Sequence, residues 1–167
     1  MEYCHLYRTD WGWGAIVKGA QGIKHVVLPE HEHETLRLIL AAMYPKLDYE
    51  EKAIDPVKEA LLRYFGGERV CFDFLLDLSE HTPFKRSVYA ATQGIPYGEV
   101  RTYGWISDQI GRSRATRAVG QALRCNPIPI IIPCHRVVRK DGTLGGFLSR
   151  TGVDFKIRLL QLEGLNI

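Results

Sequence analysis

Cys134 and His135 are adjacent, and they are the residues of this chain best suited to chemistry. A thiol beside an imidazole can act as a nucleophile paired with its general base. On a regular strand, neighbouring side chains point to opposite faces, so His135 reaches the sulfur only through an irregular backbone or a bridging water. Three prolines in segment 126–138 predict such a rigid, irregular backbone. Because packed cysteines are common, the pair alone leaves a structural and a catalytic interpretation open.

The elements that must position this pair are predicted to be mainly helical. A helix begins at Thr82, which precedes a proline at the first helical position. Residues 103–110 and 114–124 are predicted to form two short helices, capped by Thr102 and Ser113. A glycine-containing turn separates them, which is typical of a helix-turn-helix.

The first half of the chain mixes strands with helices. A hairpin is predicted at Gly22, and Pro29 is expected to end its second strand. A boundary falls near residues 79–83, so the chain is expected to form two domains, 1–80 and 81–167. The expected elements of the first domain are strands at 3–9, 14–28 and 72–78, a helix at 32–43, and a helix that begins at Asp55-Pro56 and ends at Gly66-Gly67.

Composition excludes several classes of protein. The 167 residues are 46% hydrophobic and 25% charged, which rules out a mostly disordered chain. No apolar run approaches the roughly 18 residues of a membrane span, and the N-terminus lacks a signal-peptide pattern, so an intracellular protein is expected. The four cysteines form no C-x-x-C pair and are expected to be free thiols.

Charge is divided unevenly between the two halves. Residues 1–80 carry a net charge of −5 and residues 81–167 a net charge of +8. Within 101–140 there are eight basic residues, seven of them arginine, against one acidic residue. This excess indicates contact with a polyanion, although a solvated basic face would have the same composition.

Segment 126–138, which contains Cys134 and His135, belongs to a longer series of motifs. Pro133-Cys-His-Arg-Val137, preceded by Asn126-Pro-Ile-Pro129, resembles the signature of the 6-O-alkylguanine-DNA alkyltransferases. The resemblance continues, in order, through 82–84, 97–100, 102–103, 117–120 and 160–164. It implies an α/β (α+β) fold, with a small ribonuclease-H-like domain over 1–80. Over 81–167 it implies a helical domain with a winged-helix-like helix-turn-helix.

The resemblance also implies the chemistry. Cys134 would accept a methyl or alkyl group from 6-O-alkylguanine, and from 4-O-alkylthymine, in a direct displacement that each molecule performs once. The site would lower the pKa of the thiol. His135 would take the proton through water, and Glu163 would orient His135. Asn126 would tie the end of the recognition helix (114–124) to the segment that contains Cys134. Tyr103 would help rotate the target nucleotide and donate a hydrogen bond to the departing guanine. Neither a metal nor an organic cofactor is expected.

The implied partner is double-stranded DNA that contains alkylated guanine. The target base must leave the helix, and Arg117 would fill the gap in the stack from the minor groove, independently of sequence. A monomer without membrane contact is expected, in the cytoplasm or, in a eukaryote, the nucleus. The other expected DNA contacts are Tyr103, Gly104, Arg112, Arg114, Ala115, Lys85 and Lys140. The expected substrate pocket consists of Leu123, Pro129, Val137, Phe147 and Leu148.

Some positions depart from the family pattern. Phe147 stands where a tyrosine is usual and bulkier residues follow it, so tolerance for large alkyl groups stays open. Some members bind a structural zinc with two cysteines and two histidines. Cys4 and His25 fall at comparable positions here, but Ala20 and Leu75 replace the other ligands, so no zinc is expected. Cys71 is expected to pack at the start of a strand, and Cys125 to be a buried thiol at a helix end.

Two other functions compete with alkyl transfer. A silent relative that only binds lesions would replace the reactive cysteine, and Cys134 argues against it. A helix-turn-helix regulator would not need the Pro-Cys-His-Arg segment and would normally carry a dimerisation element, which the sequence does not suggest.

Overall fold

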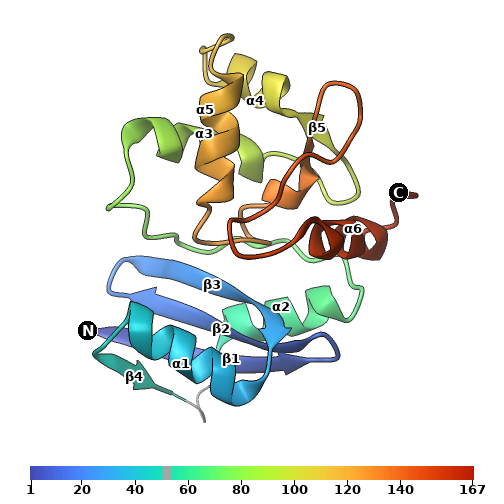
Figure 1. Cartoon of the computed structure of the whole chain (residues 1–167). Coiled ribbons are helices and arrows are strands. Elements are labelled where there is room, and N and C mark those ends of the chain that lie inside the picture. The colour runs from blue at the N-terminus through green and yellow to red at the C-terminus, as the bar shows by residue number, and fades with distance from the viewer. Residues whose placement is uncertain (51–53) are drawn as a thin grey trace. The chain divides into compact units, whose positions relative to one another are not determined.

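The computed structural model describes residues 1–50 and 54–167. Its backbone contacts divide the chain into two compact units, Met1–Leu78 and Ser79–Ile167, and each is described by itself (Figure 1). Within the described residues, no helix is long and apolar enough to cross a membrane.

The first unit is built on a mixed four-stranded sheet. Strands β1 (Glu2–Thr9), β2 (Gly12–Gly19) and β3 (Gly22–His31) form an antiparallel meander, and β4 (Leu47–Tyr49) pairs parallel to β1. The spatial order is β3-β2-β1-β4 (Figure 1). Gly22 makes the second turn possible, because its φ is +138° and a Cβ there would lie 2.4 Å from the Leu75 carbonyl oxygen.

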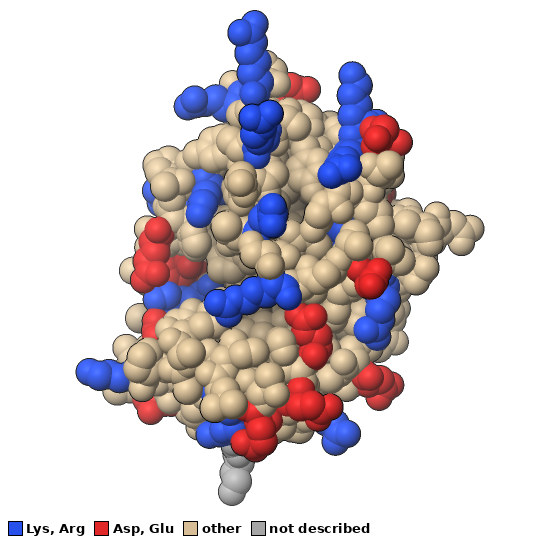
Figure 2. All heavy atoms as spheres, viewed as in Figure 1, with Lys and Arg blue, Asp and Glu red and all other residues tan. Residues whose placement is uncertain are grey.

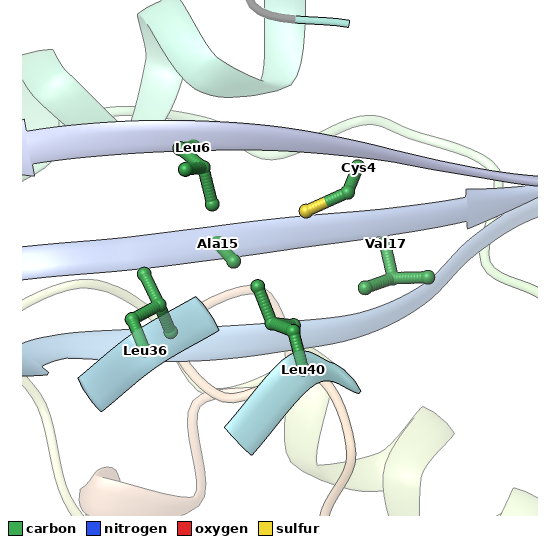
Figure 3. Packing of buried hydrophobic residues seen from close by; sticks show 6 residues of the cluster. All are labelled: Cys4, Leu6, Ala15, Val17, Leu36 and Leu40. Atoms are coloured by element: carbon green, nitrogen blue, oxygen red, sulfur yellow. The ribbon is translucent and has the colours of Figure 1, made fainter. Parts of the chain in front are cut away.

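Two helices cover the two faces of this sheet. One face of β1 and β2 is apolar, and α1 (His33–Met43) covers it with Leu36 and Leu40 (Figure 3). On the opposite face, Tyr7 stacks on Phe65 of α2 (Pro56–Phe65), with 6.4 Å between the ring centroids. Alternation of side chains along β1 therefore separates the layer of Cys4 and Leu6 from that of His5 and Tyr7.

The helices of this unit, the first strand and the hairpin at Gly22 follow the sequence prediction, whereas the end of the hairpin and the last strand depart from it. Asp55 caps α2 as expected, accepting from two backbone amides at 2.9 Å. Pro29 does not end its strand. It lies where the β2–β3 register shifts, and a residue without an N–H donor is tolerated at such an irregularity.

The predicted strand 72–78 is wrong. Among the described residues, this segment forms an isolated bridge between Leu76 and Ile23 in place of a strand, supported by hydrogen bonds from Ile23 N to Leu75 O (2.9 Å) and from Asp77 N to Ile23 O (2.8 Å). The alternation of apolar residues there resembles a strand, but one bridge does not make a ladder. The short β4 was not predicted, because three residues carry too little periodicity.

The second unit is helical, as predicted. Helix α3 (Pro83–Gln93) is capped by Thr82, and α4 (Tyr103–Gln109) by Thr102. Helix α5 (Thr116–Arg124) begins later than expected, with Ala115 rather than Ser113 at its N-cap and with no side-chain capping bond. The remaining elements are β5 (Arg101–Thr102), the 3₁₀ turn η1 (Cys134–Arg136), β6 (Val137–Val138), which pairs parallel to β5, and the unpredicted α6 (Val153–Leu162).

Candidate active site

Asn126 shapes the segment that leads to Cys134. Its side-chain amide donates to Ile132 O at 2.8 Å, and its carbonyl oxygen accepts from Ile128 N at 3.0 Å. Ile130 between them has a φ of +74°, a left-handed conformation that is uncommon for a β-branched residue. The buried Asn126 thus closes a tight loop that no regular element would form, which agrees with the irregular backbone expected from the prolines.

Cys134 begins the 3₁₀ turn η1 and is buried, with 4% of its surface exposed. Burial raises the pKa of its thiol to about 11, although the Asn126 side chain and the charge of Lys156 act in the opposite direction. The expectation that the site lowers this pKa is therefore not met in this structure, because loss of solvation outweighs both favourable contacts. At neutral pH Cys134 is a thiol that needs a proton acceptor.

His135 and Glu163 form a close buried pair. His135 Nε2 lies 2.7 Å from Glu163 Oε1, and neither side chain is exposed. Burial lowers the pKa of His135 despite the carboxylate beside it, so the imidazole is neutral at pH 7. When Nε2 donates its proton to Glu163, Nδ1 is the nitrogen that can accept one.

Arg136 holds Glu163 in place, and sequence reasoning gave it no role. Its Nε and Nη2 each lie 2.9 Å from a Glu163 oxygen, and its Nη1 donates to Ile95 O at 2.7 Å. Gly98 N donates to the same carboxylate at 3.1 Å. Burial raises the pKa of Glu163, but His135 and Arg136 outweigh it and hold this pKa well below its usual range. The carboxylate is therefore ionised and fixed.

Lys156 is a second residue that sequence reasoning missed. It lies on α6 with no exposed surface, and its ammonium donates to Val137 O (2.6 Å), Leu144 O (2.7 Å) and Gly146 O (3.1 Å). Burial lowers its pKa to about 8. One buried cation thus joins β6 to the loop that follows it. The available signal was a lysine directly after Phe155 and shortly before Leu159, on a face that would otherwise be apolar.

Cys134 opens onto a small pocket with about 190 Å³ of empty space. Phe147, in the wall, stacks on Phe155 with 6.4 Å between the centroids. The lining residues are Tyr103, Gly120, Leu123, Arg124, Cys134, Gly146 and Phe147. Of the residues expected here, Leu123 and Phe147 line the pocket. Pro129 and Val137 are buried and Leu148 is half-buried, but none of these three is among the lining residues.

Tyr103, which lines this pocket, lies close to two glycines, Gly120 on α5 and Gly145 in the loop after β6. A Cβ built on Gly145, whose φ is +69°, would lie 3.2 Å from the Tyr103 hydroxyl, and one on Gly120 would lie 3.9 Å from its ring. Burial raises the pKa of Tyr103, so its hydroxyl keeps its proton and can donate a hydrogen bond. These two glycines therefore make room for the Tyr103 ring beside the pocket.

Basic side chains lie at the turn between α4 and α5. Arg112 and Arg114 in the turn are exposed, as is Arg117 on α5. Figure 2 shows Lys and Arg side chains standing out from the end of the second unit that carries this turn. The other expected contacts are less uniform: Lys140 is exposed, whereas Gly104, Ala115 and Lys85 are half-buried.

The other three cysteines differ from Cys134. Cys4 is buried, but Cys71 and Cys125 are exposed, so the expectation that these two are packed is wrong. Cys71 lacks the strand that was to bury it, and Cys125 is the C-cap of α5. Among the described residues, no three His, Cys, Asp or Glu side chains gather closely enough to hold a metal ion.

Comparison with known proteins agrees with this geometry. A family model described as the DNA-binding domain of 6-O-methylguanine DNA methyltransferase matches residues 83–165. A methylated-DNA–protein-cysteine methyltransferase of Haemophilus influenzae is 36% identical over 96% of this chain and 86% of its own length. The chain belongs to the methylated-DNA–protein-cysteine methyltransferase family.

Other members of this family match it in sequence or in structure. The relative from Methanosarcina acetivorans is 52% identical over 60% of this chain, and the match spans 63% of that relative's length. The structure of the Mycobacterium tuberculosis OGT in complex with DNA superposes with a TM-score of 0.80 at 35% identity, covering 96% of this chain and 92% of the other. This likeness covers both units of this chain, and it agrees with the mixed α/β architecture expected for it.

Proposed function

We propose that this chain repairs DNA by moving a methyl or other small alkyl group from O6 of guanine, or from O4 of thymine, to Sγ of Cys134. The S–C bond forms as the C–O bond breaks, and the base leaves with the bonding electrons. The thiol proton passes to His135 Nδ1 through water, and the departing base gains a proton. Because the thioether is stable, each molecule acts once.

The observation that carries this proposal is the buried series Cys134, His135 and Glu163 beside a pocket. A neutral imidazole whose other nitrogen is held at 2.7 Å by a fixed carboxylate is suited to accept a proton from a neighbouring thiol. As the imidazole becomes charged, Glu163 stabilises it. Arg136 keeps that carboxylate ionised and correctly oriented, so it serves as a positioning residue.

Duplex DNA is the partner in this proposal. An alkyl carbon inside the duplex is out of reach of Cys134, so the nucleotide must rotate out through the minor groove. Exposed Arg117 fills the vacated stack, and Arg112 and Arg114 bind phosphates without regard to sequence. Tyr103, in the pocket wall, donates to the departing base. The protein acts as a monomer in the compartment that holds the DNA.

The finer fold assignments belong to the same proposal. The meander with a parallel fourth strand and flanking helices supports a ribonuclease-H-like domain over residues 1–80. Helices α4 and α5, joined by a short turn, support a winged-helix-like helix-turn-helix in residues 81–167.

The test is intact-mass analysis after mixing the protein with a duplex that carries 6-O-methylguanine. We expect a gain of one methyl group in exchange for one hydrogen, located on Cys134 by peptide mapping, with no second transfer. Cys134→Ser is the matched control and should gain nothing. Repeated turnover, or a methyl group on exposed Cys125, would exclude the proposed reaction.

A further inference from the structure

The turn between α4 and α5 lacks the usual device for starting a helix. The first amides of a helix have no acceptor within it, and a side-chain oxygen at the N-cap normally supplies one. Here the N-cap is Ala115, which has no such oxygen. The turn nevertheless carries exposed Arg112 and Arg114 and leads directly into the helix that bears Arg117.

Ser107, on the preceding helix, holds this turn by other contacts. Its side chain has no exposed surface, and its hydroxyl donates to Arg112 O and accepts from Ala115 N at 3.2 Å. Its own carbonyl accepts from Arg112 N at 2.9 Å. Both backbone polar groups of Arg112 are therefore held by one residue, and the amide at the start of α5 is held by the same hydroxyl.

We propose that Ser107 is a positioning residue for DNA binding, which holds the N-cap residue of α5 from within α4 and sets the direction in which Arg112 leaves the turn. The inference rests on the proposed function, because that function supplies the duplex that Arg112 binds. A serine inside a helix usually bonds back to a carbonyl one turn earlier. Ser107 instead reaches forward across the turn.

Loss of the Ser107 hydroxyl should lower DNA affinity by reducing the fraction of molecules in which the α4–α5 turn has the conformation seen here. Without the hydroxyl, Ala115 N keeps only its 2.8 Å bond to Arg112 O, and the Arg112 carbonyl loses its buried donor. The turn then samples other conformations, and the apparent affinity for DNA falls by the fraction that stays competent. Cys134 and its pocket lie outside this turn, so the chemical step should be unaffected.

The test compares Ser107→Ala with Ser113→Ala, which removes an exposed hydroxyl from the same turn. For each variant we would measure the Kd for an unmodified duplex by fluorescence anisotropy, together with single-turnover rates on duplex 6-O-methylguanine and on free 6-O-benzylguanine. For Ser107→Ala we expect a Kd about 3- to 30-fold higher, the range expected when a buried hydroxyl and its hydrogen bonds are lost. The maximal rate on saturating duplex and the free-base rate should equal those of the unmodified protein, and Ser113→Ala should match it throughout.

Amide hydrogen exchange locates the effect. In Ser107→Ala the Arg112 and Ala115 amides should exchange faster, while those of α3 should not change. An unchanged Kd overturns the role of Ser107, and so does an equal fall in the free-base rate, because that indicates general damage. If the unmodified protein binds duplex but gains no methyl group, the proposed reaction fails while the Kd comparison still decides the role of Ser107. If it binds no duplex, both fail.

Discussion

The dipeptide Cys-His occurs twice in this chain, once in each unit, and only the second copy is arranged for catalysis. On the regular strand β1, Cys4 faces α1 and packs near Leu36 and Leu40 (Figure 3). His5 points to the other face, where its Nε2 lies 3.4 Å from an Asp55 oxygen. Alternation along the strand therefore separates the thiol from the imidazole beside it in sequence.

Cys134 and His135 lie instead in a 3₁₀ turn. The two copies share several features: each histidine is buried beside a carboxylate, and each carboxylate contacts a cation, Lys18 for Asp55 and Arg136 for Glu163. Burial also raises the pKa of both thiols, to about 12 for Cys4 and about 11 for Cys134. Residue type and electrostatic surroundings thus do not separate the copies. Backbone conformation and an opening to a pocket do.

Removing each thiol in turn should give the largest difference between the two Cys-His copies. Cys134→Ala should abolish methyl transfer from a duplex with 6-O-methylguanine, because the acceptor atom is gone. Cys4→Ala should keep the full single-turnover rate and lose about 1 kcal/mol of stability through a small cavity. Intact mass and urea unfolding of the two variants measure both effects. Loss of transfer in a folded Cys4→Ala protein would contradict the assignment.

Removing each carboxylate gives the next largest difference. Glu163→Gln should slow transfer about 10²–10⁴-fold, because His135 loses the partner that stabilises its charged form. Asp55→Ala should leave the rate unchanged but cost about 2 kcal/mol, since α2 loses its cap. Single-turnover rates and urea midpoints separate the effects. DNA affinity should hardly change in Glu163→Gln, and an unaltered rate would show that Glu163 is not needed.

Reaction at Cys134 also requires that the target base leave the duplex, and substitution of Arg117 tests this step. Arg117→Ala should slow repair in duplex DNA about tenfold or more, because the vacated stack stays unfilled at a cost of a few kcal/mol. It should affect free 6-O-benzylguanine far less, since no base is flipped there. Arg112→Ala should instead weaken duplex binding generally and reduce the salt slope of log affinity by about 1. Equal slowing of both substrates by Arg117→Ala would contradict intercalation.

Local rules predicted the helix caps Asp55, Thr82 and Thr102. The pairing of His135 with Glu163 joins residues far apart in sequence, and it was expected from the family resemblance alone. Contacts to distant backbone were missed. Arg136 and Lys156 were not found, because their partners include carbonyl groups that only the folded chain brings near them.

Misassigned elements have the same physical origin. Segment 72–78 alternates like a strand, yet a strand requires a ladder with a partner edge, and this segment makes an isolated bridge to Ile23. The cap of α5 was sought at Ser113, next to the helix in sequence, but the N-cap is Ala115, and its amide is held by the hydroxyl of Ser107 on another helix. A local pattern indicates what a residue can do, whereas the tertiary fold selects the residue that does it.

Acid should weaken the second unit by a smaller amount, through His135. Because burial lowers its folded pKa, the imidazole stays neutral, whereas an unfolded histidine titrates near pH 6.5. Below about pH 6.5 the unfolded chain therefore binds a proton that the folded chain does not, and stability falls with pH by at most about 1.4 kcal/mol per unit for this group. Glu163, whose folded pKa is lowered, adds a loss of stability of the same sign only below about pH 4.3.

Urea midpoints measured between pH 7 and 5.5 should thus fall less steeply in His135→Gln than in the unmodified protein. The control His33→Gln, which removes a more exposed imidazole, should behave like the unmodified protein. Parallel slopes in all three would mean that folding does not lower the pKa of His135, and a steeper fall in His135→Gln would mean that folding raises it; the second result would contradict the neutral imidazole that accepts the proton of Cys134.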